Sequence, residues 1–444
     1  MNLLKSSNGK NRILTVVFAS MFLISIGMIS HNAYADTVVA TVVVGINPEG
    51  IDVNSNTNLI YVANFNSGTV SVINGLTNSV VRNIDVFNAI DGLGVNPSTN
   101  MIYVGGNYNC EIYVVNGSTN TVVSSISSSY APGDIAVNPV TNKIYVSNIG
   151  SGCGGTRALS IIDGSTNSIA STVQLAFEPQ GVAVDANTNR IYVADTGGML
   201  TVIDGATNSI VGTISVGSGA NGVTVNPNTN LIYVSTSNDV KVVDGATNSI
   251  VGTISVGSGA NGVTVNPNTN KIYVTDFTSN TVTVIDGNTN SVLQSLSVAK
   301  NPGRIAANPM TNKIYTSEID PTGPEAYTGD VSVIDGRSTV PSAPTGLTAT
   351  ANLLQINLSW NAPSDNGGTP ITGYMIERST DNGNAWSTLV ANTGKTGTTY
   401  SDTNVLPLTT YTYRVSAINS VGTSEPSNTA SATPVGATTP PSLP

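Results

Sequence analysis

The residues of this 444-residue chain best suited to chemistry are a few carboxylates. Calcium is held by oxygen ligands of this kind, and some hydrolases and lyases use them. Their spacing matches no calcium loop such as the EF-hand, and the runs equivalent to that of Asp52 carry Gly, Ala or Thr at its position. We expect solvated acids and no resident cofactor; bound Ca²⁺ in a calcium-dependent hydrolase or lyase is an alternative. The candidates are Asp52, Glu318, Asp320, Glu325 and Asp330.

Other catalytic chemistries are disfavoured by the histidine count. The single histidine, His31, lies in an N-terminal segment that we expect to be removed. Without it, Ser–His or Cys–His catalysis and His-ligated metals are excluded. No Gly-rich phosphate loop leads from a strand into a helix. We therefore expect no enzymatic activity.

The N-terminal segment is organised as an export signal. Basic residues between Lys5 and Arg12 precede an apolar run over 13–29, and "AYA" follows at 33–35. We expect cleavage after Ala35, which makes the protein secreted or cell-surface. An uncleaved anchor is the alternative, because the run is long for a signal core. No later segment is apolar enough to span a bilayer.

The charge argues against nucleic acid as a partner. The chain has 26 acidic and 16 basic residues, and removing 1–35 takes away three of the basic ones. The remainder carries a formal charge of −13. Phosphate binding requires clustered Lys and Arg.

A repeat supplies the elements that must position these residues. The motif "NPxTNxIYV" and weaker copies recur seven times, and each interval of about 40 to 50 residues holds four strand-like runs, here called a to d. Four short strands per unit predict an all-β, seven-bladed β-propeller. Runs a and b are apolar at nearly every position, as expected for sheets covered on both faces. The motif tyrosines are Tyr61, Tyr103, Tyr145, Tyr192, Tyr233, Tyr273 and Tyr315.

All variation in repeat length falls in one connection. The stretch from the Gly after run c to the next motif Tyr is constant, whereas the stretch from that Tyr to the following Gly varies. The variable part is the b–c loop. The "NPxTN" and "DGxTN" turns lie at the opposite end of the blade and are explained by turn chemistry. We interpret the motif as scaffolding, with its Tyr packed between blades and the hydroxyl bound to a polar group.

Several segments, "IYVAN", "IYVSN", "VIDGATNS" and "GVTVNPNTNK", resemble the YVTN-type β-propeller repeat of archaeal and bacterial surface-layer proteins. The resemblance covers about residues 37–337, and blade 7 departs from it with "IYTSE" and "DGRSTV". That family is largely assigned to the cell surface without a defined reaction. The resemblance thus implies a location at the cell surface and a β-propeller architecture.

Blade 7 lacks a fourth run, and the N-terminal end of the repeat region offers one. Residues 37–44 align with 209–216, and Asp36 aligns with Asn208. We predict a propeller over 36–337 in which the strand 37–44 completes blade 7 and removes an open sheet edge.

A different pattern follows a linker at 338–344. About seven short strands over 345–435 predict a β-sandwich. Trp360, Tyr374 and "LPLTTYTYRVSAINSVG" resemble a fibronectin type III domain. The resemblance places Trp360 in the core and puts Leu406 and Tyr411 at the tyrosine corner. No Arg-Gly-Asp sequence is present, so integrin-type adhesion is not implied. A Pro-rich tail occupies 436–444.

The two cysteines, Cys110 and Cys153, lie in the b–c loops of neighbouring blades, seven and eight residues after the motif tyrosine. Adjacent blades place such loops side by side, and an exported chain meets an oxidising compartment. We predict a disulfide, with two free thiols as the alternative.

The face formed by the b–c and d–a loops is the predicted binding site, because loops on a fixed scaffold usually carry specificity. We expect an exported interaction protein whose propeller and sandwich dock to surface proteins or glycans. A structural component of the envelope or surface layer is the alternative. The candidate contact residues are Glu318, Asp320, Glu325, Tyr327 and Asp330 of blade 7, with Phe87, Tyr130 and Phe177 of the d–a segments.

Overall fold

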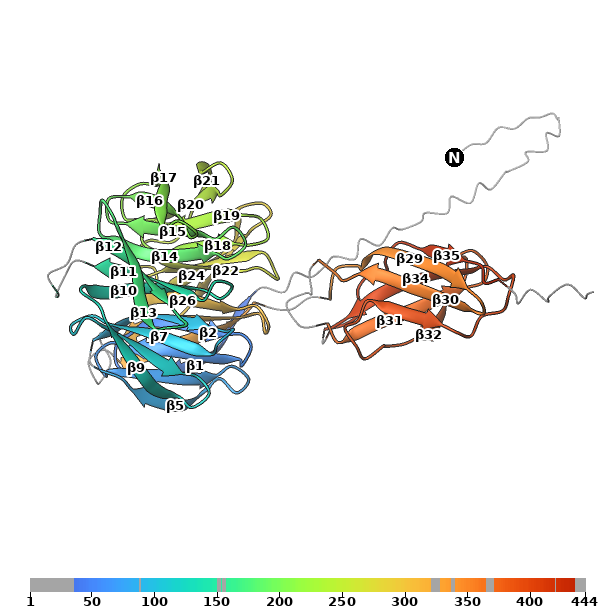
Figure 1. Cartoon of the computed structure of the whole chain (residues 1–444), viewed down its shortest axis with the longest axis horizontal. Helices are drawn as coiled ribbons and strands as arrows, with labels where there is room; N and C mark the ends of the chain where they lie inside the picture. The colour runs from blue at the N-terminus through green and yellow to red at the C-terminus, as the bar shows by residue number, and fades with distance from the viewer. Residues whose placement is uncertain are drawn as a thin grey trace, which may run out of the picture. The chain divides into compact units, whose positions relative to one another are not determined.

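A computed structural model describes residues 36–87, 89–149, 153, 157–320, 328–336, 340–364, 371–419 and 421–435, without the side chains of Asp320 and Thr328. These residues form 35 β-strands (Figure 1). Within these ranges there is no helix, and so none that could cross a membrane. The expected export signal and the C-terminal tail lie outside the described residues.

The first domain consists of seven four-stranded antiparallel sheets, so the predicted all-β propeller is confirmed (Figure 1). The innermost strands neighbour one another in a closed circle that runs β2, β6, β10, β14, β18, β22, β26 and back to β2. Blades 1 to 4 contain β2 (Pro48–Asn54), β3 (Leu59–Asn64), β4 (Thr69–Asn74), β5 (Ser79–Asp85), β6 (Ile90–Asn96), β7 (Met101–Gly106), β8 (Glu111–Asn116), β9 (Thr121–Ser127), β10 (Ala131–Asn138), β11 (Lys143–Ile149), β12 (Ala158–Asp163), β13 (Ser168–Gln174), β14 (Pro179–Asp185), β15 (Arg190–Asp195), β16 (Met199–Asp204) and β17 (Ser209–Ser215). Blades 5 to 7 contain β18 (Val223–Asn226), β19 (Leu231–Ser235), β20 (Asp239–Asp244), β21 (Ser249–Ser255), β22 (Ala260–Asn266), β23 (Lys271–Asp276), β24 (Thr281–Asp286), β25 (Ser291–Ser297), β26 (Pro302–Asn308), β27 (Lys313–Asp320), β28 (Thr328–Asp335) and β1 (Thr37–Val43).

The motif tyrosine is fully buried in every blade. Its ring packs with the Val and Ile side chains of the adjoining sheets, which explains the apolar character of runs a and b. The expected polar partner of the hydroxyl is present in three blades, and the other four hydroxyls have none among the described residues. The three bonds join Tyr103 to Asn167 Oδ1 (3.2 Å), Tyr233 to Asn290 Oδ1 (3.2 Å) and Tyr273 to Asp36 Oδ2 (2.8 Å).

The "NPxTN" turns do more than reverse the chain. The first Asn of the motif accepts a local backbone N–H, as Asn54 does from Asn56 (3.1 Å). Its Nδ2 then donates to Oδ1 of the last motif Asn in the next blade, which adopts a left-handed φ between 51° and 57°. The donor and acceptor pairs are Asn54–Asn100 (2.7 Å), Asn96–Asn142 (2.8 Å), Asn138–Asn189 (3.0 Å), Asn226–Asn270 (2.6 Å), Asn266–Asn312 and Asn308–Asn58 (2.8 Å).

This circle of interblade bonds is broken at one place. Blade 4 has Asp185 where the other blades have the donor Asn, and a carboxylate has no N–H to give. The acceptor that it leaves behind, Asn230 Oδ1, is buried and has no hydrogen-bond partner among the described residues. Asp185 itself is buried and accepts hydrogen bonds from Asn187 N (2.9 Å) and Thr188 Oγ1 (2.6 Å).

Strand β1 closes the ring. It pairs antiparallel with β28, from Thr37 opposite Asp335 to Val43 opposite Asp330. Blade 7 has no "DGxTN" asparagine of its own, and Asp36 takes that role for the tyrosine of blade 6. Asp36 is buried, lies 2.6 Å from Lys271 Nζ and accepts from the Tyr273 hydroxyl.

The second domain is a sandwich of two sheets, β29-β30-β33 and β32-β31-β34-β35. The backbone N–H of Leu406 donates to the Tyr411 hydroxyl at 3.0 Å, so the tyrosine corner is present. Trp360 is buried and meets Tyr374 edge-on at 5.1 Å between ring centroids. The strands are β29 (Thr345–Asn352), β30 (Gln355–Asn361), β31 (Gly373–Ser379), β32 (Ser387–Val390), β33 (Thr399–Asp402), β34 (Tyr411–Ile418) and β35 (Ala430–Ala432).

We predict that Asp185→Asn stabilises the propeller. The new amide can donate to Asn230 Oδ1 as its six counterparts do, and it removes a buried carboxylate. The gain in the free energy of unfolding should be about 1 kcal/mol, the net worth of one hydrogen bond. Urea denaturation measures it. The reverse change in blade 5, Asn226→Asp, should cost a similar amount, and equal stability of both variants and the wild type would contradict the role of the circle.

We also predict that Asp36→Ala lowers the free energy of unfolding by roughly 3 kcal/mol, because it leaves Lys271 and the Tyr273 hydroxyl without their buried partner. Asp36→Asn keeps an acceptor for Tyr273, as in the other blades, and should lose less. Thermal melts of chains that begin at residue 36 give the comparison. A melt unchanged by Asp36→Ala, or by deletion of 36–45, would show that β1 does not hold the ring closed.

Candidate functional site

The loop face of the propeller, formed by the b–c and d–a connections, gathers its aromatic side chains. Apart from the buried motif tyrosines, every described aromatic residue of the propeller lies at this end, and the "NPxTN" and "DGxTN" turns at the other end have none. Phe87 stacks on Tyr113, and Phe65 meets Tyr108 edge-on. The full set is Phe65, Phe87, Tyr108, Tyr113, Tyr130, Phe177 and Phe277, of which Phe87, Tyr108, Phe177 and Phe277 are exposed.

Of the predicted contact residues of blade 7, only Glu318 and Asp330 have described side chains, and neither is exposed. Glu318 is not a surface residue: it lies within β27, is only 1% exposed, and neither carboxylate oxygen has a hydrogen-bond partner among the described residues. Burial, reinforced by the nearby Asp330, raises the pKa of Glu318 to about 8. Asp330 is partly buried in β28. Asp320 ends β27, and its side chain lies outside the described part, as do Glu325 and Tyr327.

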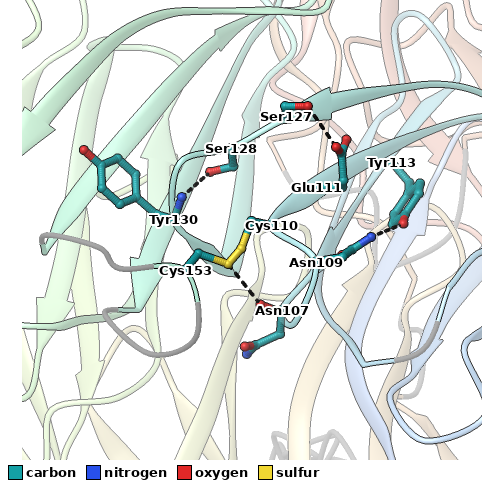
Figure 2. Close-up of a disulfide and its surroundings, with 9 residues drawn as sticks. All are labelled: Asn107, Asn109, Cys110, Glu111, Tyr113, Ser127, Ser128, Tyr130 and Cys153. Carbon is teal, nitrogen blue, oxygen red and sulfur yellow. Dashed lines mark hydrogen bonds between the residues drawn. A yellow bond between two sulfur atoms is a disulfide. The ribbon is translucent and has the colours of Figure 1, made fainter.

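The predicted disulfide between Cys110 and Cys153 is confirmed (Figure 2). The two Cα atoms are 6.3 Å apart, within the range that a disulfide spans. Cys110 adopts a left-handed φ of 60° in the b–c loop of blade 2. The bond joins this loop to the b–c loop of blade 3, so it fixes two neighbouring parts of the loop face.

A second feature of this end is a β-bulge at the start of the innermost strands. In six blades the a–b register skips two residues, for example between Pro48 and Ile51 or between Pro302 and Ile305. In blade 5 the equivalent dipeptide, 221–222, directly precedes β18. Each dipeptide consists of one glycine and one polar or charged residue, and bulges re-aim the side chains they carry. The seven side chains, here called the axial ring, are Glu49, Asp91, Asp134, Gln180, Asn221, Asn261 and Arg304.

In five blades the glycine of the pair allows the inner strands to approach one another. A Cβ on Gly262 would lie 2.6 Å from the carbonyl oxygen of Gly303 in the next blade, and one on Gly222 would lie 2.5 Å from that of Asn261. In five blades the polar residue precedes the glycine, and in blades 3 and 7 it follows. Each blade thus contributes one polar side chain to its bulge.

A cavity of about 290 Å³ runs along these inner strands. Asp52, Asp134 and Arg304 are the charged residues that line it, together with Thr224, Thr264 and aliphatic side chains. Asp52 and Asp134 each accept a hydrogen bond from a backbone N–H on the edge of the inner strand of the next blade. Asp52 accepts from Val95 N (2.8 Å), and Asp134 accepts from Val182 N (2.9 Å).

The charges of the axial ring compensate one another at a distance. Burial alone would lower the pKa of Arg304, but Asp134, Asp91 and Glu49 outweigh it, so the pKa is raised. Arg304 nevertheless makes no ion pair or side-chain hydrogen bond with any described residue. Burial, with Asp91, raises the pKa of Glu49 to about 7, and burial raises that of Asp91.

The described residues contain no preformed site for calcium. Within the described ranges, no group of three or more His, Cys, Asp or Glu side chains is close enough to hold a metal ion. Asp52 accepts hydrogen bonds from Val53 N (2.7 Å) and Val95 N, and burial raises its pKa to about 6.

The sequence reasoning selected Asp52 and the loop acids and missed the axial ring. A signal was present: the dipeptide that precedes the run ending in the first motif Asn or Asp always combines a glycine with a polar residue, whose type differs between blades. Its partners are one blade away, about 40 residues along the chain, so the sequence alone did not bring them together.

We predict that Glu318→Gln stabilises the protein increasingly as the pH rises. The folded-state pKa of Glu318 is raised above its unfolded value, so the proton-linked stability is present at low pH and is lost as the pH rises towards about 8. Gln avoids this loss. The gain over wild type should grow by up to about 4 kcal/mol between about pH 5 and about pH 9. Denaturation at both pH values measures it, with the exposed Glu425→Gln as control, and a pH-independent difference would contradict it.

Comparison with known proteins identifies the second domain by sequence. Residues 342–433 match the fibronectin type III domain family. The fast-type myosin-binding protein C of Gallus gallus is 36% identical over 124 residues, 28% of this chain and 10% of that protein. An amylopullulanase of Thermoanaerobacterium saccharolyticum is 37% identical over 89 residues, 20% of this chain and 6% of that protein. The chain therefore spans a tenth or less of the length of these relatives.

Solved structures are similar to the first domain in fold. The Cps50 (Swd1) β-propeller domain of Myceliophteria thermophila has a TM-score of 0.56 at 12% identity, covering 68% of this chain and 99% of that one. Hydrazine synthase of Kuenenia stuttgartiensis has a TM-score of 0.55 at 14% identity, covering 61% and 92%. At these identities the likeness is one of fold alone. The chain carries a seven-bladed β-propeller followed by a fibronectin type III domain.

Proposed function

We propose that this protein is exported and acts at the cell surface or outside the cell as an interaction protein, with its loop face docking to a surface protein or glycan. One observation carries the proposal: every described aromatic residue of the propeller outside the motif tyrosines lies at the loop face. Aromatic side chains beside polar loops are typical of contact patches. The disulfide fixes two of these loops, which reduces the entropy that a partner must overcome on binding.

The proposal also draws on the sequence. The N-terminal segment has the organisation of an export signal, and the repeat resembles the YVTN type of surface-layer proteins. The architecture of a propeller joined to a fibronectin type III domain is common among binding modules and requires no catalytic group. We propose that the protein is not an enzyme.

A second candidate function is that of a structural component that packs into an array. The outer strands of the propeller blades favour it. The outermost strand of every blade contains a bulge at the same place, which protects a sheet edge from pairing with another strand. In six blades the bulged residue is an exposed aliphatic side chain, which suits side-by-side packing of discs. These residues are Val39, Val81, Val123, Val211, Val251 and Leu293.

The two candidates make opposite predictions for surface substitutions. Replacing Phe87, Phe177 and Phe277 by Ala should reduce binding of the purified protein to surface extracts of the source cells at least tenfold, since aromatic anchors dominate interfaces. The matched control replaces exposed apolar residues of the opposite turns, Leu76 and Val140, and should bind as the wild type does.

Pretreating the extract assigns the partner class: protease abolishes binding to a protein, and periodate abolishes binding to a glycan. Ordered assemblies lost on replacing Val211 and Val251 by Thr, with binding unaffected by the Phe variant, would favour the structural role instead.

A further inference from the structure

The loop face contains a groove between blades 5 and 6. Its volume is about 420 Å³, within the range of small-molecule sites. The b–c loops of both blades bound it, together with the segments 219–221 and 258–261 at the start of their inner strands. Phe277 supplies an aromatic ring that is 37% exposed. The polar side chains that line the groove are Asn221, Ser237, Asn238, Ser258, Asn261 and Thr278.

The groove is open because blade 5 has a small residue and a short loop beside it. Four residues after the motif tyrosine, blades 1 and 6 have Phe65 and Phe277, whereas blade 5 has Ser237. Strand β20 begins at Asp239, six residues after Tyr233, which is sooner than the equivalent strand of any other blade. Neither a large side chain nor a long loop of blade 5 therefore covers the ring of Phe277.

Glycine widens the groove at a position where other blades carry a side chain. The residue directly before the inner strand has a left-handed φ in five blades, with Asn47, Ala89 and Asn301 in blades 1, 2 and 7. In blade 7 the side chain of Asn301 spans to the b–c loop, where its Nδ2 donates to Ile319 O (3.3 Å). Blades 5 and 6 have Gly219 and Gly259 there, both with a φ of 75°, so no side chain fills this space.

Backbone hydrogen bonds hold the walls of the groove in place. The N–H groups of Gly259 and Ala260 both donate to the carbonyl oxygen of Ser237, at 2.9 and 3.1 Å. The N–H of Phe277 donates in turn to the carbonyl oxygen of Gly259 (2.9 Å). The loop of blade 5, the segment before β22 and the loop of blade 6 are thus joined by main-chain contacts. A ligand meets a preformed groove, which lowers the entropic cost of binding.

The polar side chains of the groove are available to a ligand. None of the six forms a side-chain hydrogen bond with any described residue. Polar residues that support the scaffold nearby are bonded: the Ser279 hydroxyl accepts from Ser258 N (2.8 Å), as its counterpart Ser67 does from Ile46 N (3.0 Å). The amides and hydroxyls inside the groove are therefore not needed to hold these loops.

The lining matches an uncharged ligand with many hydroxyl groups. No acidic or basic side chain is among the described residues that line the groove, so a charged ligand would lose hydration without gaining an ion pair. Amide and hydroxyl side chains both donate and accept hydrogen bonds, as sugar hydroxyls do. The face of an aromatic ring carries partial negative charge, which attracts the C–H groups of a sugar ring. Protein interfaces are instead depleted in Ser and enriched in Tyr, Trp, Met and Arg.

We propose that the groove between blades 5 and 6 binds a neutral saccharide, with a sugar ring against Phe277 and its hydroxyls bonded to the amide and hydroxyl side chains of the walls. The inference rests on the proposed docking function and makes it more specific, because it assigns a glycan to this part of the loop face. Binding should not depend on ionic strength, since no charge takes part.

The test uses the chain without its export segment. A panel of neutral hexosides, N-acetylhexosaminides and pentosides with one to three rings is screened by saturation-transfer NMR, and the best ligand is titrated by calorimetry. At least one member should bind, with the same affinity in about 0.05 and about 0.5 M NaCl.

Ser237→Phe is the sharpest variant. Blade 6 carries Phe at the equivalent position, so the fold accommodates the ring, which fills the groove and should abolish saccharide binding. Phe277→Ala should weaken binding at least about tenfold, whereas Phe277→Tyr keeps the ring and should retain it. The matched control, Phe65→Ala, removes the ring at the same position of blade 1 and should bind as the wild type does. Thermal melts verify that each variant is folded.

Two results would overturn the proposal: no saccharide of the panel bound by folded wild-type protein, or saccharide binding that survives Ser237→Phe. Binding to surface extracts that Ser237→Phe abolishes, and that protease but not periodate removes, would assign the groove to a protein and overturn the saccharide alone. The docking function fails separately, if the variant lacking Phe87, Phe177 and Phe277 binds surface extracts as the wild type does.

Discussion

The hydrogen bond from one motif asparagine to the last asparagine of the next blade is the contact on which the rest of the propeller depends. It requires a donor at the end of an inner strand, a left-handed asparagine as the acceptor in the next blade, and a glycine behind that acceptor, because a Cβ on Gly287 would lie 2.5 Å from Asn270 Oδ1 and from its carbonyl oxygen. These requirements explain why the same few residues recur in every blade. Every blade except blade 4 is thereby bound to the next at one end of the propeller, and β1 completes the sheet of blade 7.

This constraint at one end leaves the opposite end free to vary. The turns cannot change without breaking an interblade bond, whereas the b–c loops touch no such bond and differ in length. Within the inner strands, the bulge combines a glycine with a polar neighbour whose type differs between blades. Loop length, surface aromatics, the disulfide and the axial ring all lie on the side where the scaffold imposes little, so that side is where function can be placed at low cost in stability.

The architecture could be predicted from the sequence because period, strand pattern and turn chemistry act locally and repeat seven times. The β1 closure could be predicted for the same reason, since Asp36 aligns with a repeated asparagine. The predictions that were wrong or incomplete depended on the direction in which a side chain points. Glu318 was expected at the surface because "SEIDPTG" looks like loop, yet β27 continues to Asp320 and buries it. The partners of the motif asparagines and of the axial ring lie one blade away, and a turn motif read by itself does not reveal them.

Blades 5 and 6 show how the b–c loop affects the start of the inner strand at the loop face. Residues 204–230 and 244–270 are identical, yet β22 begins at Ala260 while β18 begins only at Val223. The difference comes from the b–c loop. In blade 6, Ala260 pairs with Asp276, whereas the equivalent Thr236 of blade 5 turns back at once, with its N–H bonded to the carbonyl oxygen of Asp239 (2.8 Å). The shorter loop thus removes the partner of Ala220, whereas the N–H of Asn221 still donates to the carbonyl oxygen of Ser235 (3.0 Å). Variation in a surface loop therefore changes where the inner strand begins without altering any residue of that strand.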